Sequence, residues 1–115
     1  MEERLPAELW VTAHLRQCAA KGLPAYVTHR GAAAAGTVMV KIVMRGQGKD
    51  SGCKLLNQSR DMDGKIGWMD IFEGAAVDEP RADQYIQRAI QRDPDVWVIE
   101  VEDISGQNPF EGKIF

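Results

Sequence analysis

The stretch that decides the fold is residues 93–103, which read DPDVWVIEVED. Asp93 directly precedes a proline, and such a residue avoids the helical backbone region, so any helix before it ends here. The next four residues, 96–99, are all apolar, which predicts a central strand covered on both faces. This stretch therefore predicts a sheet with helices packed against it.

Two helices are predicted outside this stretch. The first covers residues 7–21, because Ala7, Val11, Leu15 and Cys18 share one helical face before Gly22 and Pro24 end it. The second covers residues 80–92, where Pro80 can occupy the first turn. Its apolar stripe is made by Ala82, Tyr85, Ile86, Ala89 and Ile90.

Four strands are predicted between the helices, at residues 25–30, 37–44, 54–60 and 65–72, with a glycine-rich hairpin tip at 45–52. Short turns join them, so residues 25–72 resemble an antiparallel meander. The predicted fold class is α/β of the α+β type, with the element order α-β-β-β-β-α-β. One mostly antiparallel or mixed sheet carries two packed helices. The pattern leaves the strand order open.

The composition predicts one domain spanning residues 1–115, with an irregular tail from about residue 103. Hydrophobic residues make up 44% of the chain, enough for a core that needs no metal or disulfide. Cys18 and Cys53 form no disulfide framework, and the charged residues 1–6 do not resemble a signal peptide. No apolar run is long enough to span a membrane. We therefore expect a cytoplasmic protein with no membrane contact.

The charge is unevenly distributed along the chain. The net charge is −3, which disfavours nucleic acid as a partner. Residues 21–65 hold eight basic against three acidic residues, a net of +5, whereas residues 66–115 hold four against eleven, a net of −7. One interpretation is complementarity within the fold. The other is a basic face that receives an anionic ligand or partner.

The acidic end of the last predicted strand is the first candidate site. Glu100 and Glu102 lie two residues apart, so both project from one face, and Asp103 follows them. Such carboxylates can hold a divalent ion or act as general acids and bases. The alternative is that they pair with basic neighbours, and Lys41, on the less apolar face of its own strand, is the natural partner.

A second acidic pattern is weaker. Pro94-Asp95 together with Glu111-Gly112-Lys113 has the outline of a metal-dependent nuclease motif. Short strings of this kind recur by chance, and helix-stop and turn chemistry is the favoured explanation of Pro94-Asp95. Asp61 opens a segment that resembles a calcium loop, but its twelfth position is Phe72 rather than glutamate, so a hairpin turn is favoured.

The candidate ligand-binding residues are mostly basic. Arg30, Lys41 and Arg60 would form an anion site if they gathered over one sheet face, with Gly31 offering free backbone amides beside Arg30. Asp61 and Trp97 complete this candidate set. For Trp97, core packing competes with a role as a binding platform. For the basic residues, solvated or ion-paired positions are the alternative.

Several strings resemble a known family. They are DPDVWVIEVED at 93–103, together with Leu9-Trp10-Val11, Leu15-Arg16-Gln17-Cys18, Gly22-Leu23-Pro24-Ala25, Arg30-Gly31, Gln58-Ser59-Arg60-Asp61 and Asn108-Pro109-Phe110. Together they resemble the bacterial domain-of-unknown-function family 1491 over nearly the whole chain. The resemblance implies a small, free-standing bacterial domain and no catalytic roles.

The sequence thus favours a non-enzymatic binding or protein-interaction module without a cofactor. Its partner would be an unidentified protein or a second copy in a homodimer, because unpaired strand edges invite association. The alternative is a nuclease-like, metal-assisted hydrolase. There Glu100, Glu102 and Asp103 or Asp95 would hold a divalent ion, with Lys41 or Lys113 assisting.

Overall fold

The computed structural model describes residues 5–48 and 51–115 and contains two helices and one six-stranded mixed sheet. The helices are α1 (Ala7–Ala20) and α2 (Glu79–Arg92). The strands are β1 (Ala25–His29), β2 (Val38–Arg45), β3 (Ser51–Arg60), β4 (Ile66–Asp70), β5 (Trp97–Glu102) and β6 (Lys113–Ile114). The predicted α+β class, with one sheet and two packed helices, is confirmed.

The sheet has the strand order β1-β5-β2-β3-β4-β6. Strands β2, β3 and β4 form the antiparallel meander that the sequence predicts. The first link of that meander is wrong, because β5 lies between β1 and β2, antiparallel to the former and parallel to the latter. The reason is burial: the apolar run of β5 is covered on both faces only in the interior of the sheet.

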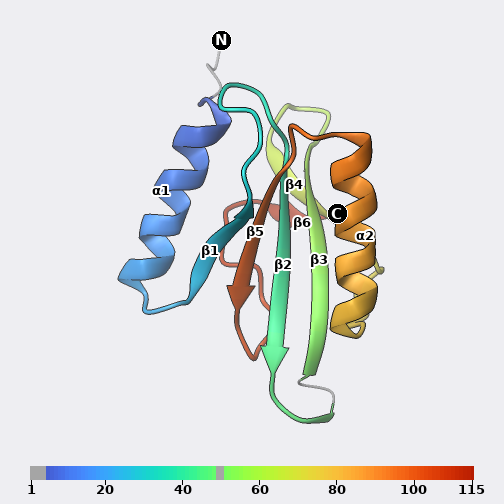
Figure 1. Cartoon of the computed structure of the whole chain (residues 1–115). Coiled ribbons are helices and arrows are strands. Elements are labelled where there is room, and N and C mark those ends of the chain that lie inside the picture. The colour runs from blue at the N-terminus through green and yellow to red at the C-terminus, as the bar shows by residue number, and fades with distance from the viewer. Residues whose placement is uncertain (1–4, 49–50) are drawn as a thin grey trace.

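The two helices cover opposite faces of the sheet, as Figure 1 shows. On the α1 side the core joins Trp10 and Val11 of α1 to Val40, Trp68 and Ile99 of the sheet. On the α2 side, a second cluster consists of Met39, Leu55, Ile86, Val96 and Val98. Seven of the eight residues of β2 are buried. One row of its side chains therefore packs into the core on the α1 side and the other into the core on the α2 side, as the alternation of apolar residues predicts.

The C-terminal tail is less irregular than predicted, because β6 pairs in parallel with β4. Phe110 is buried against Trp10, and the indole N–H of Trp68 donates to the Glu111 carbonyl at 2.8 Å. Gly112 has a φ of 108°, and a side chain there would approach the Ile66 carbonyl oxygen to 2.6 Å. The tail thus closes the core on the α1 side.

Two predictions from the sequence fall partly on residues outside the described ranges. The predicted hairpin tip at 45–52 includes Lys49 and Asp50, and the expectation of no signal peptide rests partly on residues 1–4; these residues lie outside the described ranges. Within those ranges, no helix is both long and apolar enough to cross a membrane.

Candidate functional site

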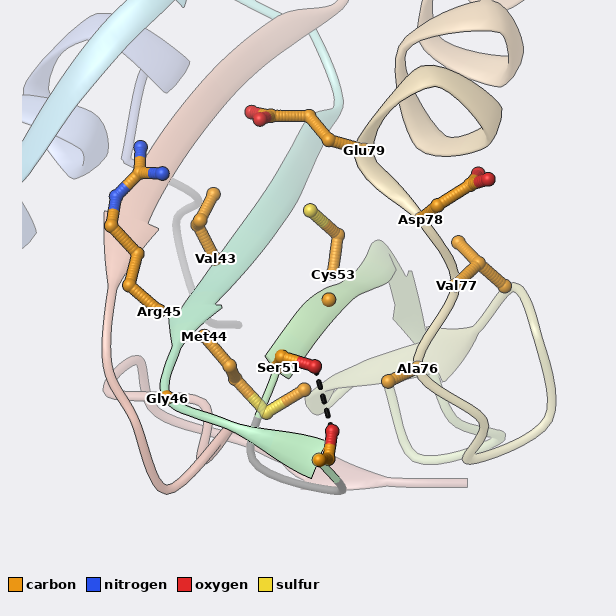
Figure 2. A pocket seen from close by; sticks show the side chains of 12 residues that line it. Val43, Met44, Arg45, Gly46, Ser51, Cys53, Ala76, Val77, Asp78 and Glu79 are labelled. Carbon is orange, nitrogen blue, oxygen red and sulfur yellow. Dashed lines mark hydrogen bonds between the residues drawn. The ribbon is translucent and has the colours of Figure 1, made fainter.

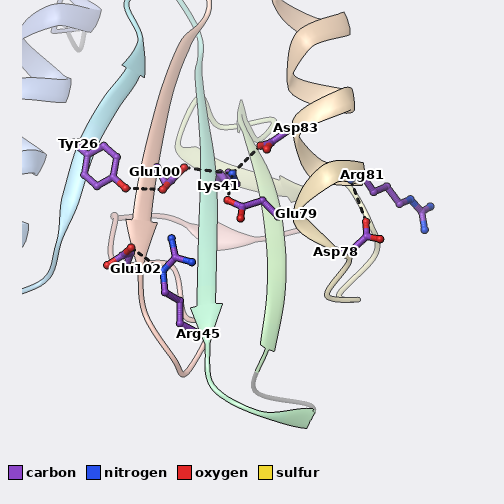
Figure 3. Close-up of polar contacts among 9 residues, drawn as sticks. All are labelled: Tyr26, Lys41, Arg45, Asp78, Glu79, Arg81, Asp83, Glu100 and Glu102. Atoms are coloured by element: carbon purple, nitrogen blue, oxygen red, sulfur yellow. Dashed lines mark hydrogen bonds and ion pairs between the residues drawn. The ribbon is translucent and has the colours of Figure 1, made fainter.

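One row of side chains crosses the sheet on the α2 side and joins three strands. Tyr26 of β1 is the register partner of Glu100 of β5, and Glu100 is the register partner of Lys41 of β2. Neighbouring residues in register project from the same face of a sheet, so the three side chains meet, as Figure 3 shows. Of the two interpretations of the acidic strand end, this contact agrees with the one in which a carboxylate pairs with Lys41.

Lys41 is a buried cation at the centre of this row, with a side chain only 5% exposed. Its ammonium donates to Glu79 Oε2 and to Asp83 Oδ1, each at 2.7 Å, and lies 3.3 Å from Glu100 Oε1. Burial alone would lower the pKa of Lys41, but the hydrogen bonds to Asp83 and Glu79 and the charge of Glu100 outweigh it and raise that pKa. Lys41 therefore stays protonated and is no general base or nucleophile.

The two nearest carboxylates come from the first half of α2. Asp78 caps this helix, because its side chain accepts the Arg81 backbone N–H at 3.1 Å. Residues four apart share one helical face, so Glu79 and Asp83 both reach Lys41. The hydrogen bond from Lys41 lowers the pKa of Glu79. The ion cluster thereby fixes the start of α2 against the sheet.

Two further contacts extend the row. The Tyr26 hydroxyl donates to Glu100 Oε2 at 2.6 Å, and this hydrogen bond raises the pKa of Tyr26. Further along β2 and β5, where both strands end, Arg45 Nε donates to Glu102 Oε1 at 2.9 Å. Both oxygens of Glu100 are therefore occupied, one by Lys41 and the other by Tyr26.

Carboxylates outnumber cations on this surface, which we call the acidic face. It consists of Tyr26, Lys41, Arg45, Glu79, Asp83, Glu100 and Glu102. Four carboxylates against two cations leave a net charge of −2. The Glu79 and Asp83 side chains are 44% and 52% exposed, so the excess charge is open to a partner. The excess of carboxylates on the acidic face suits the binding of a guanidinium or ammonium group.

A hollow of about 620 Å³ adjoins the acidic face, between the ends of β2 and β3 and the segment before α2. Figure 2 shows Val43, Cys53 and Val77 around it, with Arg45 and Glu79 shared with the acidic face. Cys53 is 1% exposed, and burial raises the pKa of its thiol. The hollow thus offers apolar contact beside charged groups and no reactive thiolate.

The acidic metal candidates are held in other contacts. Glu100 is bonded to Lys41 and Tyr26, and Glu102 to Arg45. Asp103 follows β5 in a turn, where its Oδ1 accepts from the backbone N–H and the hydroxyl of Ser105 at 3.1 and 2.9 Å. In the part of the chain that the structure describes, no three or more His, Cys, Asp or Glu side chains form a group suited to a metal ion.

The outline of a nuclease motif is not assembled. Asp95 lies between α2 and β5, and its carbonyl oxygen accepts the Ala32 N–H. Glu111 lies on the α1 side, where its Oε1 is 3.3 Å from His14 Nε2, while Lys113 begins the edge strand β6. The three residues therefore belong to different contacts.

The basic candidates are not brought together. Arg30 pairs with Glu8 at 3.1 Å, and Arg60 donates from Nη1 to the Gly64 carbonyl at 2.7 Å. Side-chain alternation from Leu56 places Arg60 on the α1 side, where it lines a hollow with Trp10, whereas Lys41 faces α2. The sheet itself separates the two cations.

The remaining candidates have structural contacts. A side chain at Gly31 would clash with the Asp95 carbonyl oxygen, and Trp97, which is 1% exposed, donates its indole N–H to the Ala32 carbonyl at 2.8 Å. Asp61 accepts the backbone N–H groups of Lys65 and Asp63, and these bonds lower its pKa. Asp61 thus closes the β3–β4 hairpin turn.

Sequence reasoning missed four members of the acidic face, namely Tyr26, Arg45, Glu79 and Asp83. The available signal was the pair Glu79 and Asp83, spaced by four residues beside the apolar stripe of α2. A lysine on an otherwise apolar strand face needs such a partner, because burying an unpaired charge is costly.

The chain matches a family model and several solved structures. The family model described as "Protein of unknown function (DUF1491)" matches residues 5–111. Among curated proteins, none matches. A DUF1491 family crystal structure from Caulobacter crescentus CB15 is 33% identical with a TM-score of 0.84, covering 97% of this chain and 100% of that one.

Two solution structures are also similar. An NMR structure of a DUF1491 family protein from Caulobacter crescentus CB15 is 32% identical, with a TM-score of 0.81 and 99% of each chain covered. Protein Atu0922 from A. tumefaciens is 27% identical with a TM-score of 0.70, covering 88% of this chain and 87% of that one. These relatives are bacterial, in agreement with the resemblance seen in the sequence.

Proposed function

The chain belongs to the DUF1491 family of proteins of unknown function, and we propose that it acts as a non-enzymatic protein-interaction module. In this proposal the acidic face holds a positively charged segment of a partner protein. The observation that carries the proposal is the excess of carboxylates around Lys41, with Glu79 and Asp83 half exposed.

The contacts of the acidic face support binding rather than catalysis. Its central cation stays protonated, so proton transfer from substrate to Lys41 has no acceptor there. The Lys41 bonds hold Glu79 and Asp83 in place before a partner arrives, which reduces the entropy lost on binding. A Lys or Arg of the partner then meets preorganised carboxylates, and its apolar neighbours fit the hollow beside Val43 and Val77.

A peptide titration tests this proposal. We would titrate ¹⁵N-labelled protein with a short peptide that repeats Lys-Leu-Ser, using its Glu-Leu-Ser counterpart as the charge control. The lysine peptide is expected to shift the amide signals of Tyr26, Glu79 and Glu100, and more weakly as salt rises. The double substitution Glu79→Gln and Asp83→Asn should weaken binding about fivefold, from two exposed ion pairs.

The matched control is Asp95→Asn, because Asp95 is an exposed acid away from the acidic face. This variant should bind like the unmodified chain. If the lysine peptide shifts no signals of the acidic face, the proposal is wrong. It is also wrong if Asp95→Asn weakens binding of the lysine peptide as much as the double variant does.

The alternative, a metal-assisted hydrolase, makes a different prediction. A divalent ion at Glu100 and Glu102 must first displace Lys41 and Arg45. Addition of Mg²⁺ or Mn²⁺ would then perturb these residues, and the double variant Glu100→Gln and Glu102→Gln would lose that response while staying folded. The interaction module predicts no such ion-specific response.

A further inference from the structure

Helix α2 carries a row of arginines on the flank away from Lys41. Arg81, Tyr85, Arg88 and Arg92 follow the spacing i, i+4, i+7 and i+11, which places all four on one helical face. The three arginines are exposed, and Figure 3 shows Arg81 pointing away from the Lys41 cluster. We call these four residues the arginine stripe.

The stripe does not contribute ion pairs to the fold. Across residues 5–48 and 51–115, no carboxylate lies within ion-pair distance of Arg81, Arg88 or Arg92. Arg81 lies in the first helical turn, where the helix dipole disfavours a cation, and Arg88 and Arg92 repel each other at a spacing of four. Only Arg92 gains from the dipole, at the last turn. Helix stability therefore does not explain the stripe.

Aromatic side chains pack against the arginine stripe. The Arg81 guanidinium lies 5.1 Å from the centre of the Phe72 ring, and Phe72 meets Tyr85 edge-on at 5.9 Å. Tyr85 lines a hollow of about 380 Å³ with Phe72, Arg81 and Arg88, and another of about 500 Å³ with Arg88 and Arg92. Apolar contact is thus available between the charges.

A third hollow extends this surface toward the edge of the sheet. It measures about 690 Å³ and is lined by Tyr85, Met69, Ile114 and Phe115, among others. Met69, Ile114 and Phe115 are each at least half exposed. Large apolar side chains grouped in this way are typical of a protein-binding surface.

We propose that the arginine stripe binds an acidic segment of a partner protein, one in which an apolar residue stands between carboxylates. The guanidinium fork matches a carboxylate, and Tyr85 with its neighbours takes the apolar residue. The stripe spans about 16 Å along the helix, at 1.5 Å per residue, so a short segment covers it. This site is separate from the acidic face and does not depend on the function proposed for it.

A protein segment fits this surface better than a nucleic acid does. Asp70 and Glu73 line the third hollow together with Tyr85, and Asp93 and Asp95 follow the C-terminal end of α2. These acids would repel a phosphate backbone that ran past the helix, and the net charge of −3 adds to the repulsion. A short acidic peptide carries only a few charges and can place its apolar residue, rather than a carboxylate, beside Asp70 and Glu73.

The test is a binding measurement with the full chain and the Glu-Leu-Ser peptide. We expect the peptide to shift the amide signals of residues 81–92, and the double variant Arg88→Gln and Arg92→Gln to weaken binding about tenfold. Glutamine keeps the helix, since its helix propensity is close to that of arginine. Arg16→Gln on α1 is the matched control, because Arg16 is also exposed on a helix.

Four results would overturn the inference. The first is no shift at residues 81–92, and the second is equal weakening by the double variant and by Arg16→Gln. The third is binding of a single-stranded oligonucleotide, and not of the peptide, through the same arginines. The fourth is a salt-sensitive dimer, seen by light scattering, that the double variant loses while the peptide does not bind.

Discussion

The two flanks of α2 carry opposite charges and use them differently. On one flank Glu79 and Asp83 reach down to a buried lysine and hold the helix to the sheet. On the other flank Arg81, Arg88 and Arg92 meet no carboxylate in the described parts of the chain and lie beside the half-buried rings of Phe72 and Tyr85. Both flanks are exposed to solvent, so exposure alone does not distinguish them.

What distinguishes the flanks is whether the fold needs the charge. Removing a carboxylate near Lys41 leaves a buried cation short of a partner, which costs stability. Removing an arginine of the stripe leaves no group unpaired. A charge that the fold does not need is the stronger indication of a binding role, whereas the acidic face combines a structural role with a surplus of negative charge.

The largest expected effect comes from Lys41→Met. The substitution leaves Glu100, only 13% exposed, without its ammonium partner, so the free energy of unfolding should fall by about 2 to 3 kcal/mol. Urea denaturation at neutral pH measures the loss. Lys65→Met is the matched control at an exposed lysine, and an equal loss in both variants would contradict the structural role of Lys41.

A smaller effect is expected from pH at the same flank. In the folded state the pKa of Glu79 is lowered below its ordinary value of 4.5. Its contribution to stability is therefore fully present above the ordinary pKa and is lost as the pH falls through the folded pKa. The pKa of Lys41 is raised from 10.5, so its contribution is lost only in strongly basic solution. The stability difference between the unmodified chain and Glu79→Gln should therefore be constant from pH 6 to 9.

The acid side gives the check on this prediction. As the pH falls below the ordinary pKa of glutamate and through the lowered pKa of folded Glu79, the difference should shrink toward zero, because Glu79 becomes protonated in the folded chain as well. Denaturation curves of both chains at a series of pH values show this directly. A difference that grows as the pH falls would mean that Glu79 is not stabilised by Lys41.

The smallest effect is expected on the other flank. The double substitution Arg88→Gln and Arg92→Gln should change the free energy of unfolding by less than about 0.5 kcal/mol, because it removes a like-charge repulsion and no ion pair. Thermal unfolding followed by circular dichroism is sufficient. A large loss would show that the stripe has a structural role, and the contrast between the two flanks would fail.

Local patterns in the sequence were enough for the elements and for the strand faces on which Lys41, Glu100 and Glu102 lie. The alternation in residues 37–44 places Lys41 among apolar residues, and the spacing of Glu100 and Glu102 places both on one face. That Lys41 and Glu100 meet depends in addition on β5 lying next to β2 in the sheet. The exposed acids Glu79 and Asp83 were missed because a charged helix flank usually faces water.

Long-range pairing was beyond the sequence pattern. The insertion of β5 between β1 and β2 brings residues more than fifty positions apart into register, such as Lys41 and Glu100. No local turn signal specifies that pairing. The same limit explains why Arg30 and Arg60 were grouped with Lys41, since only the strand order and the two helix layers show that they lie apart.

The most direct test applies both peptides, in separate titrations, to the same ¹⁵N-labelled protein. We expect the Lys-Leu-Ser peptide to shift signals around Tyr26, Glu79 and Glu100, and the Glu-Leu-Ser peptide to shift those of residues 81–92 on the outer flank of α2. If both peptides shift the same residues, or neither shifts either surface, the chain does not use the two flanks of α2 as distinct binding surfaces.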